Sequence, residues 1–174
     1  MVDVRWEGLE SESIEMCTME ASSKGVRIDS VIDTEFGSCT YVLTADDNWQ
    51  FRSLTLRLAS RSLQVDYDEV VWVVDGTERH DLDAAREVDI AVSPLTNTLP
   101  IRRLKLPVGG TADILSAYVS VPDLTVVADP QRYTRLTDLE YRYESRDSDF
   151  ERTISVDAHG LVVNYPGLFV RGAR

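Results

Sequence analysis

Apolar and polar residues alternate with a period of two along almost the whole chain, and helical periodicity is nearly absent. Because successive side chains of a strand point to opposite faces of a sheet, this pattern predicts strands buried on one side. The run 70–74 ends in Asp75-Gly76, a hairpin signal. The only helical candidate is the short segment 82–87. The other predicted strand segments are 26–32, 41–43, 54–58, 63–67, 104–106, 117–121, 139–143, 154–156 and 161–165.

Turn signals separate these strands by roughly 8–12 residues, a spacing that indicates an antiparallel sheet. A single sheet of about ten strands has to curl or close on itself. The sequence contains no internal repeat, low-complexity tract or linker. We therefore predict one all-β domain over residues 1–174, built on a single curved antiparallel sheet with little helix.

The charge of the chain narrows the classes of partner. The formal net charge is −12, and only Lys24 and Lys105 among the 18 basic residues are lysines. Nucleic-acid binding requires a basic surface, and an anionic membrane surface repels an acidic protein. High salt screens such self-repulsion, so a halophilic source is one interpretation of this composition. The alternative is an acidic protein from a genome rich in G·C pairs.

The sequence predicts no integral membrane segment, because no run of about 18 apolar residues occurs. Residues 1–7 are acidic and do not resemble a secretory signal, so we expect a cytoplasmic protein if the gene product begins at Met1. Cys17 and Cys39 are too few for a disulfide framework. Cys17 is expected to be a small buried apolar residue.

Signatures of catalysis are missing from the sequence. His80 and His159 lack the spacing of metal ligands, and the chain has neither a phosphate-cradling glycine loop nor a nucleophile elbow. Asp46-Asp47-Asn48 lacks the glycine and distal glutamate of a calcium loop, so a solvated turn is expected there. We predict no cofactor, no metal and no catalytic residue.

The tract 93–104 places Thr-Asn-Thr between Pro94 and Pro100 and ends near Arg102 and Arg103. Proline fixes φ and removes a hydrogen-bond donor, so the tract cannot belong to a regular central strand. We predict a rigid polar turn, in which a buried Asn97 makes several hydrogen bonds, followed by a strand that carries the arginines.

Alternation places Arg52, Arg102 and Arg152 on the same faces as apolar rows, while Arg103 should face the other way. A buried guanidinium group is costly unless it has a partner. The partner is either an internal carboxylate or a bound anion or lipid head group, unless the side chain reaches water at the rim of the sheet.

Several segments resemble the putative glycolipid-binding family of uncharacterised microbial proteins. They are Arg5-Trp6 and the segments 48–53, 94–104, 130–134 and 156–169, and they span nearly the whole chain in the expected order. The resemblance implies that the curved sheet forms an unclosed (half) β-barrel, similar in outline to bacterial periplasmic lipoprotein carriers. It also implies a glycolipid or similar amphiphile as ligand, by analogy at the level of the fold.

Three functions remain open at this point. The first is non-catalytic binding of an amphiphilic ligand in the concave face of the barrel. The second is an enzyme for an anionic or sugar-containing small molecule, in which Asn97, Arg102, Arg132 and an acid such as Asp157 converge. The third is a structural module, including a homodimer through sheet edges. The predicted ligand-binding residues are Trp49, Arg52, Asn97, Thr98, Arg102, Arg132, Tyr133 and Tyr165, with Tyr141 and Tyr143 on the same wall.

Overall fold

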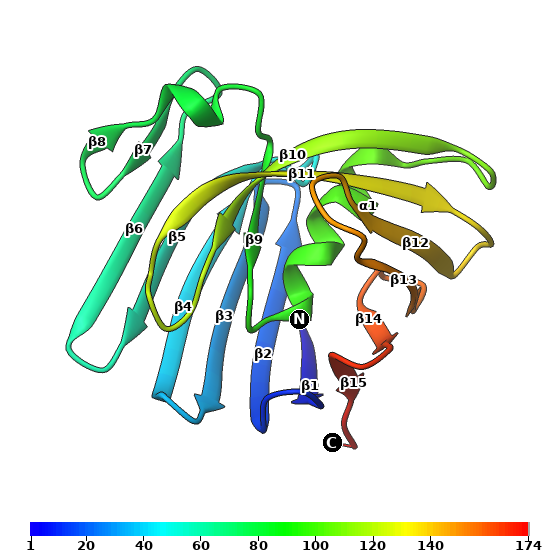
Figure 1. Cartoon of the computed structure of the whole chain (residues 1–174), viewed down its shortest axis with the longest axis horizontal. Helices are drawn as coiled ribbons and strands as arrows, with labels where there is room; N and C mark the ends of the chain where they lie inside the picture. Colours follow the sequence, from blue (N-terminus) through cyan, green and yellow to red (C-terminus); the bar gives the residue numbers. More distant parts are fainter. Residues whose placement is uncertain (174) are drawn as a thin grey trace.

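The computed structural model describes residues 1–173 and confirms an all-β protein (Figure 1). One sheet holds fifteen strands in the order β8-β7-β6-β5-β4-β3-β2-β1-β15-β14-β13-β12-β11-β10-β9. The end strands β8 and β9 do not pair with each other, so the sheet is not closed into a barrel. The pairings are antiparallel apart from that of β9 with β10, which is parallel.

The first part of the chain is a meander of eight strands, in which each strand pairs with the next. They are β1 (Val2–Gly8), β2 (Ser13–Ser22), β3 (Gly25–Thr34), β4 (Gly37–Ala45), β5 (Phe51–Leu58), β6 (Arg61–Tyr67), β7 (Trp72–Val74) and β8 (Thr77–Glu78). The Asp75-Gly76 turn joins β7 to β8, as expected from the sequence.

The second part forms the other half of the sheet and returns to the first strand, since β15 pairs with β1. Its strands are β9 (Glu87–Ile90), β10 (Thr111–Val119), β11 (Val126–Arg135), β12 (Glu140–Ser145), β13 (Glu151–Val156), β14 (Val162–Tyr165) and β15 (Phe169–Arg171). The helical pieces are the 3₁₀ helices η1 (His80–Leu82) and η2 (Pro94–Asn97) and the α-helix α1 (Thr98–Leu104).

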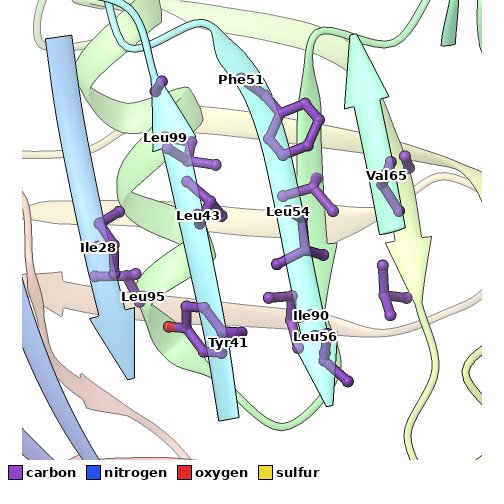
Figure 2. Packing of buried hydrophobic residues seen from close by; sticks show 14 of the residues in the cluster. Ile28, Tyr41, Leu43, Phe51, Leu54, Leu56, Val65, Ile90, Leu95 and Leu99 are labelled. Carbon is purple, nitrogen blue, oxygen red and sulfur yellow. The ribbon is translucent and has the colours of Figure 1, made fainter. Parts of the chain in front are cut away.

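The sheet curls around η2 and α1, and β10 and β11 arch across the meander (Figure 1). Leu95 of η2 and Leu99 of α1 are fully buried among the inward rows of β3, β4 and β5, as Figure 2 shows. A second cluster, around Ile101 of α1, is built from tyrosines and aliphatic residues of β11 to β15. The concave side of the meander is therefore filled by the protein's own side chains.

Two predicted segments were wrong. Of the predicted helix at 82–87, Leu82 ends η1, a turn follows, and Glu87 begins β9. Parallel pairing with β10 and the bond from the Phe51 backbone N–H to the Arg86 carbonyl hold the end of this segment extended. The predicted strand at 104–106 is the end of α1 and the loop after it. Pro100 lies in the first turn of α1, where a missing N–H costs little.

Two further differences concern the strands. The structure has fifteen strands rather than about ten. The strands without a predicted segment are β1, β2, β8, β9, β11 and β15. Of these, β8, β9 and β15 have only two to four residues each, and alternation cannot be detected over so few. In 161–165 the alternation is broken by a register shift between β13 and β14. Val162 and Tyr165 are consequently buried, whereas Val163 is exposed.

The sheet offers little free edge. Of the two edge strands, β8 has two residues and β9 is mostly buried. A homodimer through sheet edges stays a prediction. No helix within residues 1–173 is long and apolar enough to span a membrane. Cys17 is buried, as predicted, and both cysteines carry free thiols.

Candidate functional site

The tract 93–104 is ordered, as predicted, but its order is helical. Ser93 begins η2 by accepting a hydrogen bond from the backbone N–H of Leu95 (3.3 Å). Asn97 is buried, and its side-chain amide donates to the hydroxyl of Tyr133 (2.8 Å). This is the one hydrogen bond that the Asn97 side chain makes to another described residue, where several were expected. The Thr98 hydroxyl donates to the Gly160 carbonyl (3.0 Å), which ties α1 to the β13–β14 turn.

A cavity of about 260 Å³ lies between η2 and the strands of the second half of the sheet. We call it the aromatic pocket. Its rings support one another: Tyr143 lies 5.9 Å from Phe150 and 6.2 Å from Tyr165, measured between ring centroids. The residues that define the pocket are Asp89, Ser93, Asn97, Tyr118, Tyr143, Phe150, Tyr165, Leu168 and Phe169.

Three phenol groups of the aromatic pocket are uncommitted. The hydroxyls of Tyr118, Tyr143 and Tyr165 make no hydrogen bond to any other residue in 1–173. Burial, and then the nearby Asp89 carboxyl, raise the pKa of each of these tyrosines. All three hydroxyls therefore stay protonated at neutral pH and are available as donors and acceptors for a bound molecule.

Asp89 is the carboxyl group of the aromatic pocket. It accepts hydrogen bonds from Thr96 (3.0 Å) and from the side-chain amide of Gln131 (2.8 Å), and the same amide nitrogen bonds Asp129 (2.7 Å). Burial raises the pKa of Asp89 against the effect of these bonds, and the Asp129 charge adds to the rise. Each carboxylate oxygen keeps a lone pair free, because a carboxylate accepts about four hydrogen bonds.

A second hollow, of about 530 Å³, lies at the other end of α1. We call it the cationic pocket. The Arg102 guanidinium lies over the Trp49 ring at 4.9 Å, and the Arg135 guanidinium lies 5.8 Å from the Tyr141 ring. The residues that define this pocket are Asp47, Trp49, Arg102, Lys105, Arg135, Asp138, Tyr141, Asp157 and Gly160.

Arg52 does not line the cationic pocket but stabilises the turn that carries Trp49. A register shift between β4 and β5 moves Arg52 off the apolar face that alternation assigned to it, so that prediction was wrong. Its guanidinium instead pairs with Asp46 (2.7 Å) and with Glu69. The other oxygen of Asp46 accepts the backbone N–H groups of Asn48 and Gln50, both at 2.9 Å. This network fixes the turn that presents Trp49.

The other predicted arginines are also accounted for. Arg103 was expected on the opposite face of a strand from Arg102. Because this segment is the helix α1, Arg103 instead pairs with the buried Glu87. Arg152 lies at the rim, 4.5 Å over the Phe150 ring, and bonds two backbone carbonyls. Arg132 pairs with Asp113 through two hydrogen bonds of 2.7 and 2.8 Å, on the face of β11 opposite to Tyr133.

The predicted site residues thus fall into separate groups. Asn97 and Tyr165 line the aromatic pocket, and Tyr133 lies directly behind it. Trp49 and Arg102 line the cationic pocket, with Arg52 and Thr98 in supporting positions. Arg132 belongs to neither pocket. The sequence analysis missed Asp89 and Tyr118, which are brought together by the parallel pairing of β9 with β10, a pairing that no local pattern signals.

The largest hollow, of about 950 Å³, is an open groove on the outer face of β1 to β5. It holds none of the predicted site residues, and most of its lining side chains face outward from a single sheet. We therefore place the candidate site in the two smaller pockets. Within residues 1–173, no group of His, Cys, Asp and Glu side chains is arranged to hold a metal ion.

These features define an all-β protein built on one curled, unclosed sheet, with two pockets at opposite ends of a short helical tract. The model of the family described as putative glycolipid-binding matches residues 3–171, and the chain belongs to this family. The resemblance seen in the sequence is thereby confirmed.

One solved structure supports the same assignment. The chain is similar to the crystal structure of a DUF1089 family protein from Pseudomonas aeruginosa, with a TM-score of 0.78 and 33% identity, over 90% of this chain and 91% of that chain. No curated protein matches the chain.

Proposed function

We propose that this protein binds an amphiphilic molecule with a sugar-containing head group, without transforming it, and that the aromatic pocket holds the sugar. The observation that carries the proposal is the set of three uncommitted tyrosine hydroxyls around one small cavity. A sugar offers several hydroxyls to such groups, and its C–H faces pack on the electron-rich faces of aromatic rings.

The size of the aromatic pocket limits which part of the ligand it can hold. Pockets for drug-sized ligands occupy about 300–1,000 Å³, and the aromatic pocket is slightly smaller, at about 260 Å³. It takes the head group alone. The alkyl part then lies across the rim, where Phe150 and Leu168 are half-buried. The exposed Leu9 lies beside Leu168, because its backbone N–H donates to the Leu168 carbonyl (2.8 Å). Membership of the family supports a binding role.

Calorimetric titration tests the proposal with octyl glucoside below its micelle concentration. Two comparison ligands are glucose, which lacks the chain, and octyl tetraethylene glycol, which carries the chain but no sugar. Octyl glucoside is expected to bind saturably and at least about tenfold more tightly than the polyether, because each retained hydrogen bond contributes about 0.5–1.5 kcal/mol.

Hydroxyl-deleting variants locate the binding site. Tyr143→Phe and Tyr165→Phe each remove one oxygen from the aromatic pocket and should weaken glucoside binding about three- to tenfold. Tyr141→Phe is the matched control on the same strand, because Tyr141 lines the cationic pocket. Native mass spectrometry of protein from its own host should show a co-purifying glycolipid.

Three results would count against this function. Equal binding of the polyether would show that only the alkyl chain is recognised. Unchanged binding in the Tyr143→Phe, Tyr165→Phe double variant would move the sugar out of the aromatic pocket. Release of octanol from the glucoside would show hydrolysis, and Asp89 would then become the first residue to test as a general acid.

A further inference from the structure

Arg102 stands out among the arginines. In the part of the chain that the structure describes, it neither donates a hydrogen bond to another residue nor forms an ion pair, and only Arg57 shares this property. Arg61, Arg86 and Arg152 also lack a carboxylate, but each of them bonds a backbone carbonyl instead. Arg57 is exposed on the outer face, whereas Arg102 is half-buried in the cationic pocket.

The acids of the cationic pocket, Asp47, Asp138 and Asp157, bond groups other than Arg102. Asp47 accepts a hydrogen bond from the side-chain amide of Asn48 (3.1 Å). One oxygen of Asp157 accepts the backbone N–H groups of His159 and Leu161 (2.8 and 3.0 Å), and its other oxygen accepts Arg171 (2.7 Å). These bonds hold the pKa of Asp157 below its usual range despite partial burial. Asp138 accepts a hydrogen bond from Arg135 (3.4 Å). The charge of Arg102 is therefore left for something else.

Two contacts hold the Arg102 side chain in place. Its guanidinium lies over the ring of Trp49, which belongs to the turn that Asp46 and Arg52 hold. A Cβ added to Gly160 would lie 3.1 Å from the Arg102 Cδ, so the side chain also passes close to the β13–β14 turn. Because neither contact uses an N–H group, the guanidinium keeps its donors free for a planar or tetrahedral oxyanion.

Lys105 supplies a second positive charge. It follows α1 in the left-handed conformation (φ 47°), lines the same pocket, and makes no hydrogen bond or ion pair within residues 1–173. An arginine fork beside a lysine ammonium is a combination suited to phosphate, because the fork gives directional bonds and the ammonium a compact charge.

We propose that the cationic pocket binds a phosphate group through Arg102 and Lys105, as a site separate from the aromatic pocket. Two of the acids in the pocket, Asp138 and Asp157, are neutralised by Arg135 and Arg171, and charges farther than about 8–10 Å are screened at ordinary ionic strength, so the net negative charge of the protein does not prevent this. The phosphate comes either from a soluble phosphate ester or from an anionic lipid head group, and both present the same oxyanion.

Calorimetric titration with inorganic phosphate and with phenyl phosphate tests the site. Sodium chloride is lowered stepwise as the phosphate is added, so that the ionic strength stays constant. Flotation with phosphatidylcholine vesicles, with and without phosphatidic acid, tests the lipid source. Arg102→Gln should weaken phosphate binding at least about tenfold, because two charge-assisted hydrogen bonds are lost. Arg102→Lys should be intermediate, since the charge stays and the fork is lost.

Arg57→Gln is the matched control, because it removes the same charge from an arginine that is equally unpaired but lies outside the pocket. It should leave phosphate affinity within about twofold. Binding of soluble phosphates or of phosphatidic acid vesicles that depends on Arg102 supports the proposal and identifies the source. Absence of both, or an equal loss in Arg57→Gln, would overturn it. Octyl glucoside binding should be unchanged in Arg102→Gln, so the two proposals fail separately.

Discussion

The hydroxyl of Ser93 donates a hydrogen bond to the carboxyl of Glu15 at 2.9 Å, across 78 positions of the sequence. Ser30 and Tyr41 donate to the same oxygen, Oε1, at 2.7 and 2.8 Å. The other oxygen, Oε2, is buried without a partner in the described chain. One acid of β2 therefore anchors the start of η2, and with it the segment that fills the concave side.

The first prediction concerns the pH dependence of this anchor. Burial, only partly offset by the three hydroxyls, raises the pKa of Glu15 to about 7. Because the folded-state value lies above the unfolded one, Glu15 stabilises the fold fully below about pH 4.5, and this contribution is lost as the pH rises through 7. Glu15→Gln removes the titration, so the variant should gain on the natural protein by roughly 2–3 kcal/mol between pH 5 and pH 8.

Urea unfolding of both proteins at several pH values measures this difference. Glu20→Gln is the control, because Glu20 lies on the same strand and is exposed. Its difference from the natural protein should change little with pH. A gap between Glu15→Gln and the natural protein that is constant from pH 5 to pH 8 would show that Glu15 does not titrate in this range.

Glu15 also shows where sequence reasoning failed on β2. The inward row of this strand begins Ser13, Glu15, Cys17, whereas the apolar Ile14 and Met16 face outward. The usual pattern of apolar residues inside and polar residues outside is inverted here, because an acid lies in the core, where it accepts a hydrogen bond from the start of η2. Alternation assumes that apolar residues face inward, so it cannot identify a strand whose buried face carries a polar network.

The second prediction tests the pair that holds η2 against β11. Asn97→Ala leaves the buried Tyr133 hydroxyl without its donor and should destabilise the protein by about 1–3 kcal/mol. Tyr133→Phe should cost less, because the Asn97 amide can turn toward the aromatic pocket. In a double-mutant cycle of chemical unfolding, the two changes should couple by at least about 0.5 kcal/mol. Additive effects would mean that the bond does not stabilise the folded state.

The third prediction concerns the close approach of α1 to the β13–β14 turn. Gly160 has φ +77°, and an added Cβ would lie 3.3 Å from a methyl group of Ile101 as well as near Arg102. Gly76 has nearly the same φ, +79°, with nothing within 4 Å. Gly76→Ala therefore reports backbone strain alone, of about 1–2 kcal/mol, and Gly160→Ala should lose about a further 1–3 kcal/mol through overpacking.

Thermal or chemical unfolding compares the two alanine variants. Similar losses would show that Ile101 and Arg102 move aside without cost. In that case Gly160 is required only for its backbone conformation, and the β13–β14 turn does not fix the position of the Arg102 side chain.

The candidate site was predictable only in part, for a reason seen at Trp49 and Arg102. Arg102 was assigned to the face of a strand, yet it lies on a helix and meets Trp49 of a turn. The predicted local geometry of Arg102 was therefore wrong, while the ligand-binding role of the two residues stays a prediction. The tyrosines of β12 were correctly expected to share a face, because alternation within one strand needs no tertiary information. Asp89 depends on a parallel pairing between distant segments, which periodicity does not encode.

The last prediction concerns salt. With a formal charge of −12 and two lysines, the folded state should suffer self-repulsion at low ionic strength. Molar salt shortens the screening length to about 3 Å, so the free energy of unfolding should rise between about 0.1 and 2 M KCl.

Because excluded salts also strengthen apolar burial, the comparison needs a second salt that screens equally but salts out less. A gain that follows ionic strength in both salts would identify repulsion as the cause and favour a halophilic origin. Full stability in dilute buffer, with no response to either salt, would leave the acidic surface as a feature of composition and remove the support for that origin.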